Sequence, residues 1–271
     1  MWEVKSQSQR LAYNKSMFFT ESSYLGIDPT AGRKPFAYAA LDMYLHLTAL
    51  GRGSLDEVLT FMAGQHQAIV AVCAPRRPNQ RLMERTEVRD SLNPPPRPGR
   101  WMNFRLAEYL MRQHRISCYK TPSDEKACPN WMKMGFTLYK RLERMGYQPY
   151  PTQDSALQWL EVYPHASFSA LLGQVPLPKS TLEGRLQRQL VLHRQKIDLP
   201  NPMDFVQGLT SRNLLQGDLP LDKLYNQGEL DALVAAYTAW QAANNPKQIT
   251  ALGEASEGLV YLPVGELKRH Y

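Results

Sequence analysis

Residues 54–75, SLDEVLTFMAGQHQAIVAVCAP, join an amphipathic helix to an apolar strand, and this pair of elements decides the fold. Ser54 with Glu57 three residues later is a capping-box pattern, and apolar residues then recur at helical spacing. The following run AIVAVCA lacks the polar alternation of a strand with one face in water, so it predicts a central strand buried on both faces. A crossover helix of this kind returns the chain to a parallel strand.

Three strand-like runs precede this unit, at residues 22–28, 34–42 and 43–50, and their short connections favour a meander. The rest of the chain predicts helices at 102–114, 130–146, 165–173, 181–195, 201–216 and 229–245, a strand at 156–164, and a hairpin or final strand at 253–267. Strands that alternate with helices in this way predict the α/β class.

The composition is that of an ordinary globular protein, with 43% hydrophobic and 21% charged residues among 271. This excludes a fully disordered, collagenous or coiled-coil chain. No apolar run approaches the roughly 18 residues of a membrane span, and the N-terminal sequence lacks the apolar core of a secretory signal. Three cysteines make no disulfide framework. We expect a cytoplasmic protein that does not contact membranes, with an N-terminal arm at 1–22 and one domain at 23–271.

The positive charge is concentrated in one stretch. Residues 76–150 hold 16 basic and 7 acidic residues, a net charge of +9, whereas the whole chain carries +7. Aromatic residues are interleaved there, a mixture that proteins use to bind single-stranded nucleic acids. An arginine-rich solvated surface over an aromatic core explains the same pattern. The proline-rich segment 93–99 predicts that this stretch begins as an exposed loop, inserted after the apolar strand.

Three acidic residues interrupt apolar patterns at informative places. Asp28 ends the first strand, Glu161 ends the strand at 156–164, and Asp231 lies near the start of the last helix. Asp231 shares a helix face with Val234 and Ala235, so it faces the rest of the protein. A buried carboxylate is costly unless it is paired or binds a metal.

Carboxylates that converge from two strand ends and a helix could hold Mg²⁺ or Mn²⁺, which prefer oxygen ligands. Two such ions about 4 Å apart would stabilise the attacking and leaving oxygens of a phosphodiester. Each acid also has a simpler explanation, because acids are favoured in the first turn of a helix and at turns that follow strands.

Several basic residues are candidates for binding the phosphates of a nucleic acid, namely Arg33, Lys34, Lys179, Arg185 and Arg188. Arg185 and Arg188 lie three residues apart on one predicted helix face, so both could reach one substrate; a solvated helix face is the alternative. His165, just after Pro164, could act as a general acid or base, or could hydrogen-bond the start of a helix. The sequence has no P-loop, no dinucleotide-binding glycine motif and no nucleophile elbow.

Eight blocks of sequence together resemble a known family. They are YLGIDPTAG, the strand that ends in CAP, NFRLAEYLMRQHRI, GFTLYKRLERMGY, EVYPHASFSALLG, LPKSTLEGRLQRQLVL, ELDALVAAYTAW and GLVYLPV. In this order they resemble the bacterial domain of unknown function 429 family, which is described as predicted nucleases with a ribonuclease H-like fold. The resemblance runs from about residue 24 to residue 264.

The resemblance implies a mixed five-stranded sheet flanked by helices, with metal-binding acids at its centre. By position, Asp28 is similar to the first-strand aspartate of that fold, Asp231 to the acid on the late helix, and Glu161 to the acid of the EVYP block. Glu108 matches a family position that is either structural or part of the site. The family's fourth strand usually ends in Asp-Ala-Pro, whereas this chain has Cys73 there. A thiol is a poor ligand for Mg²⁺, and a small buried hydrophobic residue is the other reading of Cys73.

The sequence therefore favours a metal-dependent nuclease in which Asp28, Glu161 and Asp231 bind Mg²⁺ or Mn²⁺ and the stretch 76–150 binds the strand. The alternative is a catalytically degenerate nucleic-acid-binding or assembly protein on the same fold, because Cys73 replaces the family aspartate. A phosphotransferase is a third reading, but it would need a second nucleotide-binding lobe for which the chain is too short.

Overall fold

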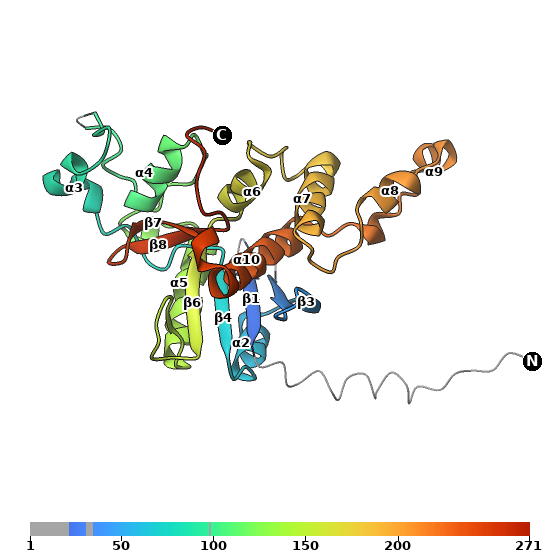
Figure 1. The fold of residues 1–271 in the computed structure, drawn as a ribbon, viewed down its shortest axis with the longest axis horizontal. Coiled ribbons are helices and arrows are strands. Elements are labelled where there is room, and N and C mark those ends of the chain that lie inside the picture. The colour runs from blue at the N-terminus through green and yellow to red at the C-terminus, as the bar shows by residue number, and fades with distance from the viewer. Residues whose placement is uncertain (1–21, 31–34, 98) are drawn as a thin grey trace, which may run out of the picture.

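An eight-stranded mixed sheet runs through the described part of the chain (Figure 1). The computed structural model describes residues 22–30, 35–97 and 99–271, so nearly all of the predicted arm at 1–22 lies outside it. The strands are β1 (Ser23–Asp28), β2 (Phe36–Leu41), β3 (Leu47–Gly53), β4 (Ala68–Val72), β5 (Gln148–Pro149), β6 (Leu157–Val162), β7 (Thr250–Glu254) and β8 (Gly258–Leu262). Their order is β3-β2-β1-β4-β6-β8-β7, and β5 pairs with β6.

Helices lie on both faces of this sheet. The α-helices are α2 (Leu55–Ala63), α3 (Thr86–Asp90), α4 (Leu106–Gln113), α5 (Asn130–Arg144), α6 (Pro164–Leu172), α7 (Leu182–Arg194), α8 (Met203–Gln207), α9 (Ser211–Gln216) and α10 (Gln227–Asn244). Short 3₁₀ turns are η2 (Leu82–Glu84), η3 (Glu125–Ala127), η4 (Leu221–Lys223) and η5 (Pro246–Gln248). Within the described residues no helix is long and apolar enough to cross a membrane.

The predicted meander and crossover are confirmed. β1, β2 and β3 pair antiparallel in sequence, and α2 then returns the chain to β4, which is parallel to β1. The predicted capping box at Ser54 and Glu57 is present. β6 and β8 extend the parallel part, and β7 adds an antiparallel edge. The sheet is wider than the five strands that the family resemblance implies, because β5 and the C-terminal hairpin of β7 and β8 add to it.

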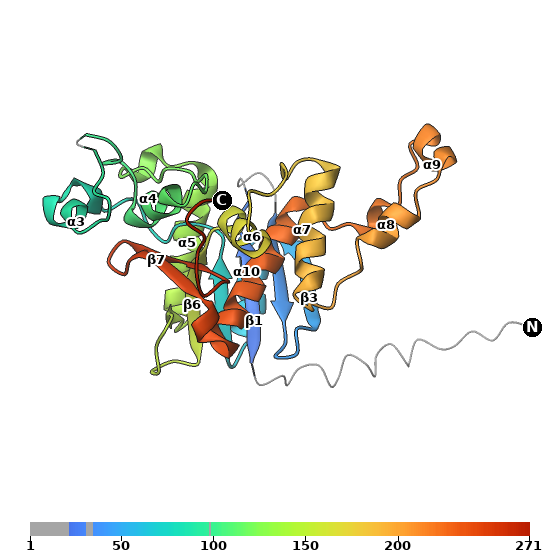
Figure 2. The same ribbon diagram turned by 45° about the horizontal axis from the view of Figure 1, so that its top comes forward.

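The two faces of the sheet have separate cores. On one face, α10 packs against β1, β2 and β4, and it is covered in turn by α6 and α7 (Figure 2). This explains why α10 is apolar nearly all round: it is buried between the sheet and other helices. On the other face, side chains of α2 and α5 pack against Ile27 of β1 and Val72 of β4.

The predicted insertion at about 76–150 corresponds to the chain between β4 and β6. Its helix α5 packs on the sheet, whereas α4 packs under the hairpin of β7 and β8. The prediction of one helix over 201–216 is wrong. The structure has the shorter helices α8 and α9, because α8 ends at Gly208 and the Thr210 side chain caps a new helix by accepting a hydrogen bond from the Asn213 N–H.

Helix α10 lies close to β1 at Gly26. A Cβ atom at this position would lie 1.9 Å from the main-chain oxygen of Ala232 and 2.4 Å from the nitrogen of Ala236. These are backbone atoms, which cannot move aside as the tip of a flexible side chain does. Only glycine therefore allows the helix and the strand to approach to this distance.

We predict that Gly26→Ala lowers the free energy of unfolding by about 1–3 kcal/mol or more, because the added methyl group overpacks a backbone contact. Gly64→Ala is the matched control: its Cβ would lie 3.6 Å from the Phe61 oxygen, an ordinary contact, and φ is −79°. We expect the control to be neutral or slightly stabilising. Urea denaturation of both variants measures the difference, and equal stabilities would contradict this account of the packing.

Candidate functional site

Asp28 and Asp231 come together where α10 begins over the end of β1. Asp28 is the last residue of β1, and its Oδ1 accepts a hydrogen bond of 3.1 Å from the Thr30 N–H. Its other carboxylate oxygen faces the first turn of α10, since a Cβ on Gly228 would lie 3.5 Å from it. Asp231 is on the same helix and only 6% exposed. The packing of one helix on one strand therefore places two carboxylates side by side.

The pKa values of both carboxyl groups are raised. Burial raises the pKa of Asp28 to about 7, and the neighbouring charge of Asp231 adds to the effect. Burial also raises the pKa of Asp231, although the ammonium group of Lys179 opposes this. Two like charges in a poorly solvated place repel each other, so a proton or a cation near them is favoured.

Lys179 supplies a positive charge to this pair. Its Nζ lies 3.0 Å from Asp231 Oδ2, and its side chain remains 55% exposed. The residue belongs to the loop between α6 and α7, and the charge of Asp231 raises the pKa of its ammonium group. Lys179 thus lies between the buried carboxylates and the solvent.

Cys73 follows β4 directly and bonds to both β1 and α10. Its N–H donates to the Ile27 oxygen at 2.8 Å, and its Sγ donates to the main-chain oxygen of Asp231 at 3.5 Å. Burial, together with the charges of Asp28 and Asp231, raises the pKa of this thiol well above its usual range. Cys73 therefore remains a neutral thiol at the position where the resemblance implies an aspartate.

Glu161 is not brought to the other two acids. In the parallel register, Ile27 of β1 is opposite Val72 of β4, and Val72 is opposite Glu161 of β6. Residues opposite one another point to the same face of a sheet, and successive residues along a strand alternate. Glu161 therefore lies on the face of Ile27, whereas Asp28 lies on the face of α10. The expectation that Glu161 completes a three-acid site does not fit this geometry.

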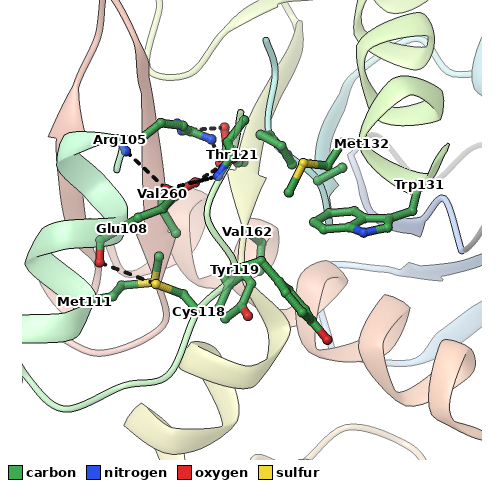
Figure 3. A pocket seen from close by; sticks show the side chains of 14 residues that line it. Arg105, Glu108, Met111, Cys118, Tyr119, Thr121, Trp131, Met132, Val162 and Val260 are labelled. Atoms are coloured by element: carbon green, nitrogen blue, oxygen red, sulfur yellow. Dashed lines mark hydrogen bonds and ion pairs between the residues drawn. The ribbon is translucent and has the colours of Figure 1, made fainter. Parts of the chain in front are cut away.

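Glu161 instead belongs to a buried charge network with the insertion. Arg105, only 1% exposed, donates from both Nη atoms to Glu161 at 2.7 and 3.1 Å, and the Arg76 N–H donates at 3.1 Å. Glu108 accepts from the N–H groups of Arg105 and Thr121, which gives it a structural role in this conformation (Figure 3). A buried ion pair depends on additional hydrogen bonds of this kind to its carboxylates, and here the Arg105 Nε is the group left without a partner among the described residues of the network.

The predicted phosphate-binding residues have different fates. Arg33 and Lys34 lie outside the described residues. Arg185 donates to the main-chain oxygens of Leu224 and Tyr225, so it holds the loop before α10. Arg188 is buried and donates to the oxygens of Leu177 and Gly184. Of the described candidates, Lys179 alone presents its charge both to the acid pair and to the solvent.

The donors suit one cation better than two. Two carboxylates supply the oxygen ligands that Mg²⁺ takes from a protein when substrate phosphates complete its shell. The part of the chain that the structure describes contains no set of three or more His, Cys, Asp or Glu side chains placed to hold a metal. The pair Asp28 and Asp231 therefore fits a single hard cation, whereas the predicted pair of ions lacks ligands.

The family model described as "Protein of unknown function (DUF429)" matches residues 26–253. The chain belongs to this family. The match includes Asp28, Cys73, Lys179 and Asp231, and it stops within β7. No curated protein and no solved structure matched the chain. The family description names no activity, so the chemistry has to be argued from the site itself.

Sequence reasoning missed Arg105 and Glu257, which belong to the buried charge network around Glu161. Glu257, 1% exposed, accepts from the N–H groups of Gln80 and Leu106. Arg105 directly precedes α4, and Glu108 three residues later accepts a hydrogen bond of 3.1 Å from the Arg105 N–H, which is one half of a capping box. No sequence signal connects Arg105 to Glu161, which is 56 residues away along the chain.

We predict that Glu161→Gln lowers the free energy of unfolding by about 3 kcal/mol, because the buried Arg105 loses its nearest counter-charge. The loss should not be larger, because Glu108 and Glu257 still neutralise part of the Arg105 charge. The more exposed pair of Arg76 and Glu143, 2.8 Å apart with side chains 22% and 38% exposed, provides the control. Glu143→Gln should cost roughly 0–1 kcal/mol. Denaturation curves that show equal losses would mean that the buried pair contributes no more than a surface pair.

We predict that Asp28→Asn stabilises the fold above pH 7 and that this gain disappears towards pH 4. Folded Asp28 keeps its proton up to about pH 7, whereas an unfolded aspartate releases it near pH 3.9. Between these values the wild type loses stability as the pH rises, by at most about 1.4 kcal/mol per pH unit for this group, and asparagine does not. Urea denaturation from pH 4 to pH 8 measures the difference, and parallel profiles would contradict it.

Glu57→Gln is a control whose effect on stability should change with pH in the opposite direction to that of Asp28→Asn. Hydrogen bonds from the backbone and side chain of Ser54 lower the pKa of Glu57. Its carboxylate therefore contributes stability at neutral pH, and that contribution is lost as the pH falls through its folded pKa. The control variant should be less stable than the wild type near pH 7 and should approach it in acid.

Proposed function

We propose that this protein hydrolyses phosphodiester bonds of a nucleic acid with the help of one divalent cation, Mg²⁺ or Mn²⁺, held by Asp28 and Asp231. The observation that carries the proposal is the pair of carboxylates with raised pKa values at the end of β1, with the Lys179 ammonium group at their solvent side. Such a pair is costly to a fold, and perturbed acids of this kind concentrate at functional sites.

The chemistry of the donors supports this proposal over other enzyme classes. The bound cation would act as a Lewis acid on a phosphoryl oxygen. Lys179 would attract and orient the phosphate, since its exposed ammonium group lies 3.0 Å from Asp231. The charge excess of residues 76–150 would help to hold the rest of a nucleic acid strand.

His165 is a second group of this site that can handle a proton. It lies in the first turn of α6, near enough to Lys179 and Arg188 for their charges to act on it. Burial, followed by the charges of Arg188 and Lys179, lowers the pKa of the imidazole. A neutral imidazole at pH 7 can accept a proton from an attacking water or, once protonated, donate one to a leaving oxygen.

The decisive experiment measures cleavage of labelled single- and double-stranded DNA and RNA with Mg²⁺ or Mn²⁺. We expect the wild type to cleave and both Asp28→Asn and Asp231→Asn to lose at least about 100-fold in rate, because cation polarisation is worth several kcal/mol. Asp56→Asn, an exposed acid of α2, should leave the rate unchanged.

Thermal melts with and without Mn²⁺ separate the possible failures. An ion that binds only the folded state raises the melting temperature, and the two Asn variants should abolish this rise. Binding of the ion without cleavage of any substrate would contradict the nuclease proposal and leave a metal-binding protein. If the protein neither binds the ion nor cleaves a substrate, the result would favour the alternative of a catalytically degenerate nucleic-acid-binding protein.

A further inference from the structure

A large aromatic side chain is exposed in the region of Lys179. Tyr119, in the loop between α4 and α5, is 67% exposed, and Lys120 next to it is exposed as well. Exposure of a tyrosine to this extent leaves most of its apolar ring in water, and aromatic side chains commonly keep such exposure for binding. The rest of its loop is anchored, because Cys118 and Thr121 on either side are buried.

Trp131 extends the aromatic surface that Tyr119 begins. The two ring centroids are 5.9 Å apart with the planes tilted by 58°. Both rings line a small cavity with Ala74 and Pro75, the two residues after Cys73, and Figure 3 shows Trp131 across that cavity from Arg105 and Glu108. The aromatic pair therefore lies at the same end of the sheet as Asp28 and Asp231.

Two interactions relate Tyr119 to elements of the candidate site. Its main-chain N–H interacts with the hydroxyl group of Tyr163, the residue that immediately precedes α6. Its phenol group lies near enough to Lys179 to act on that ammonium group electrostatically. Tyr119 and Lys179 therefore lie in the same region of the molecule, and Lys179 in turn pairs with Asp231.

We propose that Tyr119 and Trp131 form a platform on which a base of a single-stranded nucleic acid stacks while the adjoining phosphate reaches Lys179. This inference rests on the proposed nuclease function and names its substrate class. Aromatic rings beside a positive charge are the combination that binds single strands without sequence preference. A duplex keeps its bases stacked on one another, so its bases have no free face for Tyr119.

The test is a binding measurement on the full chain, made by fluorescence anisotropy in EDTA with labelled single-stranded DNA and RNA and a duplex of the same length. EDTA prevents cleavage, so binding is measured apart from catalysis. We expect the single strands to bind more tightly than the duplex, and Tyr119→Ala to weaken single-strand binding by about 5- to 150-fold. Tyr119→Phe keeps the ring and should bind within about twofold of the wild type.

Tyr44→Ala is the matched control, because Tyr44 is a similarly exposed tyrosine, at 69%, in the connection between β2 and β3. It should bind as the wild type does. The platform is overturned if Tyr119→Ala binds normally, if Tyr44→Ala loses as much as Tyr119→Ala, if the duplex binds as tightly as the single strands, or if the wild type binds neither single strand.

These outcomes are separable from failure of the nuclease proposal. If the protein prefers single strands through the Tyr119 ring but cleaves no substrate, the platform is supported and the nuclease proposal is contradicted. Cleavage that depends on Asp28 but is indifferent to Tyr119→Ala would leave the nuclease and remove the platform.

Discussion

The close approach of α10 to β1 at Gly26 is the constraint on which the candidate site depends. Because Gly26 has no side chain, the helix backbone rests on the strand, with Ala232 and Ala236 at the contact. This contact fixes where the helix begins over the strand end, and so it places Asp231 beside Asp28. Burial then raises the pKa values of both carboxyl groups. The packing that stabilises the fold therefore also buries the carboxylates of Asp28 and Asp231, which costs free energy.

Alternation along the strands divides the charged residues into two centres with different properties. On the α10 face, Asp28 and Asp231 share one lysine that remains half in solvent. On the opposite face, Glu161 is bonded to Arg105 by both of its oxygens, and the insertion is thereby attached to the sheet. The first centre has an incomplete balance of charge, which suits a ligand, whereas the carboxylates of the second, Glu161, Glu108 and Glu257, all accept hydrogen bonds from the protein, which suits a structural joint.

Cys73 explains how this member of the family tolerates its acid pair. An aspartate at this position would add a third negative charge near Asp28 and Asp231. The neutral thiol instead donates to the main chain of α10 and leaves Lys179 to balance two carboxylates. Under the proposed function, a thiol in place of a hard ligand would leave donors for one cation, and Lys179, His165 and Tyr119 would provide the contacts to a substrate.

The sequence by itself predicted most of the order of elements and named Asp28 and Asp231 among three candidate acids, but it did not determine which of the three meet. The capping box at Ser54, the apolar β4 and the small residues of α10 are local patterns, and local propensity and periodicity were sufficient to read them. The face to which Glu161 points depended on the register of β6 against β4, and the partners of Arg105 and Arg188 depended on contacts between distant segments. Only the tertiary structure could decide these, because an acidic or basic residue looks the same in sequence whether it meets solvent, a ligand or a buried counter-charge.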